Sequence, residues 1–225
     1  MIGFGLKRFY YLLFHFPMRA NALRHRLFQS KRSGQKVHLG PGQVNYLTGW
    51  INMDANFLTA KIDLWANIAD ALPFRADSID AFYSHHVIEH LPDNELAGHF
   101  SDMFKCLKPG GVIRVGGPNG DSAMKKFLAG DKSWFSDFPD KRESIGGRFA
   151  NFILCRGEHL SILTASYLTE LAAAAGFKDI SVCQPSSFTN YPGIFDRQVL
   201  DKEPESDPEC PHTLLIEARK PDLVH

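Results

Sequence analysis

The sequence lacks an apolar run long enough to cross a bilayer, which takes about 20 residues. Its longest aromatic and aliphatic stretch, Phe9–Phe16, is far shorter. Lys7 and Arg8 precede this stretch, as in a signal peptide, but it contains His15 and is followed by Pro17 and further arginines instead of a small-residue cleavage site. We therefore expect neither a membrane span nor a secretory signal, and we expect a cytoplasmic protein.

Acidic residues are absent from residues 1–53, although the whole chain is neutral, with 25 basic and 25 acidic residues. The same stretch holds eight basic residues, so the rest of the chain carries a net charge of −8. A basic leader before an acidic body indicates an anionic contact, such as a membrane surface or nucleic acid. The rest of the chain lacks a nucleic-acid-binding module, so we expect no nucleic-acid partner.

Residues 1–33 are expected to form a basic, aromatic helical extension, broken into two short helices near Pro17. Two interpretations of it stay open. The extension lies on the inner face of a membrane with its cations at the headgroups, or it packs its aromatic side chains on the domain or on a second subunit. The sequence leaves the oligomeric state open as well.

The four cysteines show no C-x-x-C spacing and no small disulfide framework, which indicates free thiols in a reducing compartment. The sequence also lacks internal repeats. With 225 residues, one domain plus an extension is the simplest organisation. We predict a domain over residues 34–220, an insertion at about 120–163 that caps the substrate, and a tail at 221–225.

Short apolar runs alternate with predicted helices, which indicates an α/β fold: a Rossmann-like, doubly wound, mostly parallel sheet with an antiparallel last strand. The interval between Gly42 and Trp50 is too short for a full crossover helix. Three runs each end in a turn or in polar side chains: Lys36–Leu39 before Gly40–Gly42, Trp50–Met53 before Asp54, and Asp80–Tyr83 before Ser84–His86. Groups at the carboxyl ends of strands form the ligand sites of such sheets.

His86-Val87-Ile88-Glu89-His90 matches H-x-x-E-H, an inverted zinc-protease signature. That chemistry needs both histidines on one helical face, whereas His86 follows a strand directly and Pro92 comes two residues after His90. We therefore predict no metal, and a rim of acid–base groups in which His86 and Glu89 handle a proton. His159 could reach the same cleft, or it could be an ordinary surface histidine.

Taken together, these segments resemble the class I S-adenosylmethionine (SAM)-dependent methyltransferases of the small single-domain type. The resemblance covers about residues 36–218. It rests on the order of five motifs: LGPG (Leu39–Gly42), GWINMD (Gly49–Asp54), LPFRADSID (Leu72–Asp80), SHHVIEHL (Ser84–Leu91) and LKPGG (Leu107–Gly111).

The resemblance implies SAM as cofactor and assigns its contacts by position. Gly40 and Gly42 approach the methionine part, and Asp54 binds the ribose hydroxyls. Asn67 and Ile68 flank the adenine. The remaining implied residues are Ser84 and His85, which line the pocket, and His38, which stands where many members carry an acid that holds the methionine amine.

Methyl transfer from SAM is an in-line displacement that needs alignment and, for a hydroxyl acceptor, a general base. The sequence favours a small-molecule, saccharide or lipid-linked acceptor, because the leader suggests a membrane and the family resemblance suggests envelope saccharides. The alternative is a non-catalytic SAM-binding or membrane-interface protein with a degenerate methyltransferase fold. A nicotinamide enzyme is disfavoured, because the third glycine of the dinucleotide fingerprint is missing.

Overall fold

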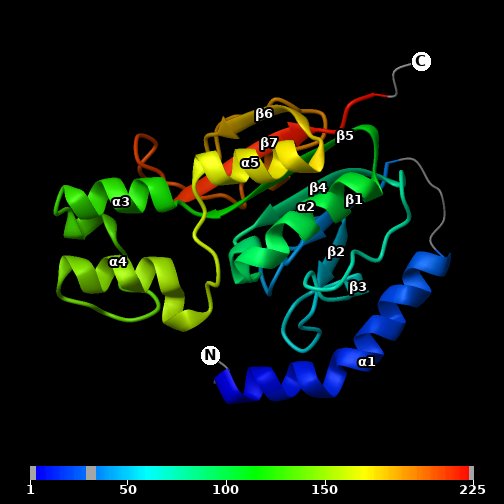
Figure 1. Cartoon of the computed structure of the whole chain (residues 1–225), viewed down its shortest axis with the longest axis horizontal. Helices are drawn as coiled ribbons and strands as arrows, with labels where there is room; N and C mark the ends of the chain where they lie inside the picture. Colours follow the sequence, from blue (N-terminus) through cyan, green and yellow to red (C-terminus); the bar gives the residue numbers. More distant parts are fainter. Residues whose placement is uncertain (1–3, 29–33, 223–225) are drawn as a thin grey trace.

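The computed structural model describes residues 4–28 and 34–222, and within them seven strands form one sheet in the order β3-β2-β1-β4-β5-β7-β6 (Figure 1). Strands β1 to β5 run parallel, and β7 runs antiparallel to both β5 and β6. The predicted doubly wound sheet with an antiparallel last strand is confirmed. The strands are β1 (Lys36–Leu39), β2 (Ile51–Asp54), β3 (Leu64–Trp65), β4 (Ile79–His85), β5 (Leu107–Pro118), β6 (Lys178–Cys183) and β7 (Thr213–Arg219).

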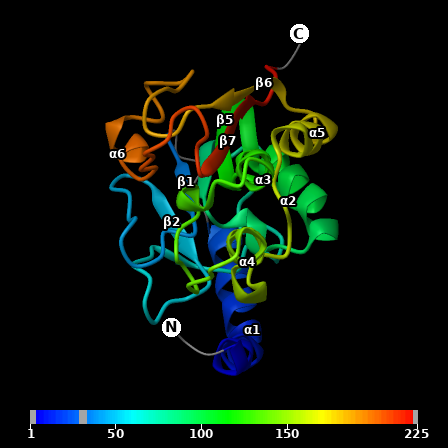
Figure 2. The same cartoon turned by 90° about the vertical axis from the view of Figure 1, so that its left-hand side faces the viewer.

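Helices cover the sheet on both faces. On one face α2 and α5 bury Leu96, Phe100 and Leu168 against the strands. On the other, Phe195 and Val199, at and beside α6, pack with Trp50; Figure 2 shows α6 on the opposite side of the sheet from α2 and α5. The α-helices are α1 (Phe4–Phe28), α2 (Asp93–Cys106), α3 (Gly120–Leu128), α4 (Ile145–Leu154), α5 (Ala165–Ala175) and α6 (Arg197–Leu200). Three 3₁₀ turns are η1 (Ile88–His90), η2 (Lys132–Trp134) and η3 (Cys155–Gly157).

Local sequence signals explain several boundaries. Helix α5 starts where the Thr164 hydroxyl accepts a hydrogen bond from the Tyr167 N–H, and it ends at Gly176 with φ 103°. Helix α2 begins at Asp93, so this residue does not hold the N-cap position, which falls on Pro92. The Asp93 carboxylate instead accepts a hydrogen bond from the Tyr167 hydroxyl at 2.7 Å, which ties α2 to α5.

Helix α1 is continuous through Pro17, so the predicted break into two helices is wrong. Figure 1 shows the helix bending midway, as expected for an internal proline that removes a hydrogen bond and crowds the preceding turn. Its inner face packs on the sheet edge, where Met18 is 1% exposed and the Asn21 amide donates to the Trp65 carbonyl at 2.9 Å. Of the helices in the described ranges, none is long and apolar enough to span a membrane.

The segment 120–163 builds a small unit beside the sheet, with α3 and α4 next to each other (Figure 1). It has an apolar cluster of its own, centred on Trp134, Phe135 and Ile153. The chain leaves this unit through η3 and returns to the sheet near η1, where the Glu89 carbonyl accepts hydrogen bonds from the N–H groups of Leu160 and Ser161. The unit is thereby held next to the carboxyl end of β4.

Candidate functional site

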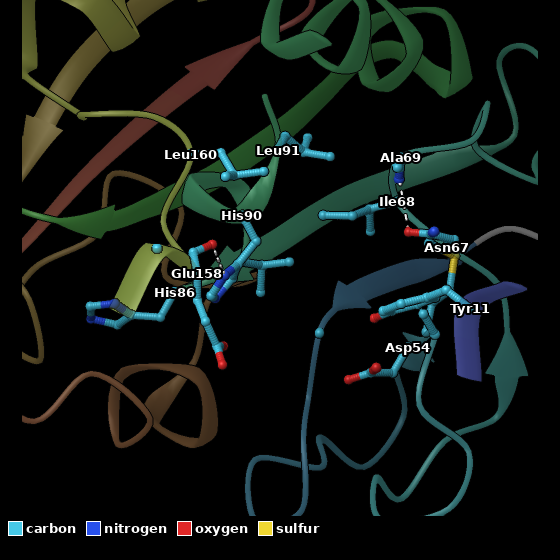
Figure 3. Close-up of a pocket in the computed structure, with 15 residues that line it drawn as sticks. Tyr11, Asp54, Asn67, Ile68, Ala69, His86, His90, Leu91, Glu158 and Leu160 are labelled. Atoms are coloured by element: carbon cyan, nitrogen blue, oxygen red, sulfur yellow. Dashed lines mark hydrogen bonds between the residues drawn. The ribbon is translucent and has the colours of Figure 1, made fainter. Parts of the chain in front are cut away.

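A cavity of about 530 Å³ lies at the carboxyl ends of β1, β2 and β4. This is the edge where open α/β sheets bind ligands, and the volume suits a small organic molecule. Figure 3 shows two walls that face each other across it. We call one the β2 wall, formed by Tyr11, Gly40, Asp54, Asn67 and Ile68, and the other the β4 wall, formed by His86, Val87, His90, Glu158 and Leu160.

Asp54 stands at the end of β2 with its carboxylate held by the main chain. Oδ2 accepts a hydrogen bond from the Gly42 N–H at 3.2 Å, and Oδ1 accepts one from the Asn56 N–H at 2.8 Å. A carboxylate fixed in this way has a defined orientation, which suits two neighbouring hydroxyl groups.

Gly40 opens the turn after β1 with φ 66°, a conformation that side chains rarely adopt. A methyl group added to it would clash with the side chain of Val87. The turn therefore requires glycine for two reasons, and it brings backbone to the cavity with no side chain in the way. Gly42, at φ 55°, has open space around the same position.

Asn67 and Ile68 follow β3 and line the cavity beside Asp54. The Asn67 side-chain oxygen accepts a hydrogen bond from the Ala69 N–H at 3.1 Å, which fixes the amide in a turn. The resulting arrangement places an apolar side chain next to an oriented amide, and a flat heterocycle could pack on the first and pair with the second.

Tyr11 completes this wall, and the sequence analysis did not assign it a role. It reaches the cavity from α1, and burial together with the nearby Asp54 charge raises the pKa of its hydroxyl. The phenol therefore stays protonated at neutral pH and remains a hydrogen-bond donor. The aromatic leader was the only hint in the sequence, and it did not indicate which ring would point inward.

The three predicted proton-handling residues lie close together at the β4 wall, but only His86 lines the cavity; Glu89 and His159 do not. Glu89 is 1% exposed, and its Oε1 lies 3.4 Å from His86 Nδ1 and 4.0 Å from His159 Nε2. His86 takes up φ 56°, and its Nε2 is paired with the Thr213 hydroxyl at 3.0 Å. His90, which the sequence analysis placed in a motif without giving it a role, also lies 4.0 Å from Glu89 Oε1.

Four predicted cofactor residues lie outside the cavity lining: Gly42, His38, Ser84 and His85. His38 is buried against Asn52, and burial lowers its pKa to about 4, so it is neutral at pH 7. Ser84 and His85 lie beneath the β4 wall, and burial lowers the pKa of His85 as well. Their roles toward a cofactor stay predictions.

The sequence between residues 39 and 115 matches the family model described as a methyltransferase domain. That span runs from the end of β1 into β5 and includes Gly40, Asp54, Asn67, His86 and Glu89. No curated protein matches the chain significantly.

Solved structures with the same fold cover nearly the whole chain. A SAM-dependent methyltransferase from Archaeoglobus fulgidus is 16% identical with a TM-score of 0.53, covering 94% of this chain and 100% of its own. Another SAM-dependent methyltransferase, from Thermotoga maritima, is described as a possible histamine N-methyltransferase. It is 16% identical with a TM-score of 0.53, and the match covers 95% of this chain and 94% of that structure's chain.

A third structure is a phosphoethanolamine N-methyltransferase 2 from Haemonchus contortus, in complex with phosphomonomethylethanolamine and S-adenosylhomocysteine. It is 16% identical with a TM-score of 0.50 and covers 91% of this chain and 53% of its own. At this identity the three structures establish the fold.

Proposed function

We propose that the chain is a class I SAM-dependent methyltransferase that methylates a hydroxyl group of a small saccharide or lipid-linked acceptor at an anionic membrane surface; the match of residues 39–115 to a methyltransferase domain supports the activity. The observation that carries the membrane part is that one helix, α1, both lines the cavity through Tyr11 and exposes apolar side chains on its other side. A membrane on α1 would lie next to the mouth of the cavity.

The β2 wall fits SAM in its chemistry. We assign the ribose hydroxyls to the Asp54 carboxylate, the methionine part to the turn at Gly40, and the adenine to Asn67 and Ile68. Support comes from the oriented Asp54 carboxylate and from the glycine turn that leaves backbone accessible. When bound there, SAM would supply the acceptor oxygen with a methyl group activated by a positively charged sulfur, and S-adenosylhomocysteine would be the product left on these residues.

The three residues around Glu89 are proposed to deal with the acceptor's proton. His86 would accept it at Nε2, which now contacts the Thr213 hydroxyl, and Glu89, 3.4 Å from Nδ1, would stabilise the imidazolium that forms. His159 lies on the other side of the Glu89 carboxylate, with Nε2 4.0 Å from Oε1, and is proposed as a second acid–base group. We assign Ser84, His85 and His38 to the layer that supports the two walls, since all three lie directly behind them in the ends of β1 and β4.

The outer side of α1 supports a contact with lipid. Its most exposed apolar residues include Leu12 and Phe16, at 78% each. Arg24 and Arg26 are exposed on the same helix, and residues 1–53 contain no acidic residue to oppose an anionic surface. Apolar side chains beside cations, with no acid, are the composition of helices that lie in a membrane interface. The two interpretations of the leader are thus compatible, because its two faces differ.

Transfer of a labelled methyl group from SAM to membrane extracts of the source organism tests the proposal. We expect label in the lipid-linked saccharide fraction with the wild-type protein, and loss of that label with Asp54→Ala. Label recovered in protein or nucleic acid instead would refute the proposed acceptor class. Equal labelling by Asp54→Ala would refute the assignment of the cofactor site.

A further inference from the structure

We propose that Glu89, His90 and His159 bind one divalent metal ion of the zinc type at the β4 wall. This goes beyond the proposed function, and the binding itself does not depend on it. Nothing in the methyl transfer described above requires a metal. The inference rests on how these three side chains are placed and on which of their atoms carry protons.

The three side chains converge on one point from two chain segments. The Nε2 atoms of His90 and His159 each lie 4.0 Å from Glu89 Oε1, and the three atoms lie within 4.8 Å of one another. Glu89 and His90 belong to η1, whereas His159 follows η3. The hydrogen bonds from Leu160 and Ser161 to the Glu89 carbonyl hold the two segments together. The cluster is therefore part of the packed structure and not a chance meeting of mobile side chains.

Main-chain carbonyls fix the protonation of both rings. His90 Nδ1 lies 2.9 Å from the Glu158 carbonyl, and His159 Nδ1 lies 3.1 Å from the Ile153 carbonyl. A carbonyl only accepts, so each Nδ1 must carry the hydrogen, and in a neutral ring Nε2 then carries a lone pair. Histidines that bind metals are oriented in this way, with the other ring nitrogen donating to a carbonyl.

Two lone pairs and a carboxylate oxygen thus point at one another, which is repulsive unless a cation lies between them. A proton on one ring would serve a single N–O pair, and 4.0 Å is too long for a hydrogen bond. A tetrahedral zinc ion bonded at about 2.0–2.1 Å needs ligand atoms about 3.3 Å apart. Side-chain rotations that move each ligand atom by roughly 1 Å would bring them to this separation.

The donor set indicates the class of metal. Two imidazole nitrogens with one carboxylate is a set found in catalytic zinc sites, whereas magnesium prefers oxygen ligands throughout. Three protein ligands leave a fourth position, and His90 and its neighbour Glu158 line the cavity. If the proposed function holds, an acceptor oxygen could take that position and lose its proton more easily.

From the sequence we predicted no metal, because the H-x-x-E-H stretch is interrupted by the preceding strand and by Pro92 and cannot form a long helix. The structure confirms that η1 is only three residues long. However, the third ligand proposed here comes from His159, 69 residues after His90 in the chain, and replaces the first histidine of the motif. His86 stays beside the site, with Nδ1 at 3.4 Å from Glu89 Oε1.

Isothermal titration calorimetry tests the proposal on the full-length protein after chelator treatment and dialysis, with ZnCl₂ and MgCl₂ as probes. We expect one zinc per chain and no comparable magnesium binding. His90→Ala and His159→Ala should each weaken zinc binding by about 100-fold or more. The matched control His15→Ala, which removes a histidine from α1, should leave it unchanged. Cobalt(II) should give the visible absorption of a tetrahedral site in the wild type alone.

S-adenosylhomocysteine binding, measured on the same samples, separates this proposal from the proposed function and reports that the variants are folded. Zinc binding lost in His90→Ala with S-adenosylhomocysteine binding retained supports the metal site, whatever the acceptor proves to be. Zinc affinity equal in the wild type and in the His90→Ala/His159→Ala double variant would overturn it, as would a wild type that binds no zinc.

Discussion

The Asp54 carboxylate accepts a hydrogen bond from the Gly42 N–H at 3.2 Å, which joins the end of β2 to the turn after β1. Asp54, which we assign to the ribose of SAM, and the turn after β1, which we assign to the methionine part, are therefore structurally coupled. A disturbance of the turn should reach the carboxylate, and a change in the carboxylate should loosen the turn.

Replacing Gly40 by alanine tests the turn. The φ of 66° costs an alanine about 1–2 kcal/mol, and the clash with Val87 adds about 1–3 kcal/mol. We expect the free energy of unfolding in urea to fall by about 2–5 kcal/mol. Gly42→Ala, with a similar φ but open space, should cost only about 1–2 kcal/mol. Val87→Ala should relieve part of the cost in the double variant, and a strictly additive result would contradict the contact.

The outer side of α1 is tested by Leu12→Glu combined with Phe16→Glu. Both side chains are exposed, so the free energy of unfolding should change by no more than about 0.5 kcal/mol. Flotation with vesicles containing phosphatidylserine should be lost, because the substitutions remove apolar contact and add repulsion. Leu128→Glu, at an exposed position of α3, is the matched control and should float like the wild type. Equal flotation of all three proteins would refute the membrane contact.

Arg114 tests the packing behind the site. Its guanidinium is fully buried, with 2.6 Å to Glu203 and 2.7 Å to Glu217. Arg114→Met would leave both carboxylates buried without a counter-charge, which should cost about 3–5 kcal/mol in urea unfolding. Replacing all three residues by apolar ones should cost much less, since no charge is then stranded. If Arg114→Met proved as stable as the wild type, the ion pairs of Arg114 with Glu203 and Glu217 would contribute nothing to stability.

The burial of His99 should make the folded protein less stable in acid. His99 is buried on α2, and burial lowers its pKa from 6.5 to about 4. Between those values the unfolded chain binds a proton that the folded chain does not, so stability is retained above pH 6.5 and is lost as the pH falls toward 4. This one residue should cost about 2 kcal/mol between pH 7 and pH 5. In His99→Leu the fall measured by urea unfolding should be smaller by that amount; identical pH slopes would contradict the assignment.

The sequence predicted features that depend on neighbouring residues. The order of strands and helices, the short connection after β1 and the ends of α5 all follow from local patterns such as Thr164 and Gly176. It predicted only part of what distant segments bring together: it named His159 as able to reach the cleft of His86 and Glu89, but it gave no role to Tyr11 or His90. Tyr11 reaches the cavity because α1 packs on the sheet edge, and His90 meets His159 because the insertion returns beside η1. The helix break predicted at Pro17 is wrong, because packing of α1 on the domain outweighs the local cost of an internal proline.

Calorimetric titration with S-adenosylhomocysteine tests the central claim most directly, with the wild type, Asp54→Ala and the surface control Asp201→Ala compared. A hydrogen-bonded carboxylate contributes about 2–3 kcal/mol, so Asp54→Ala should bind about 30- to 150-fold more weakly while Asp201→Ala binds like the wild type. Equal affinity in the wild type and Asp54→Ala, or no binding by the wild type, would contradict the cofactor site described here.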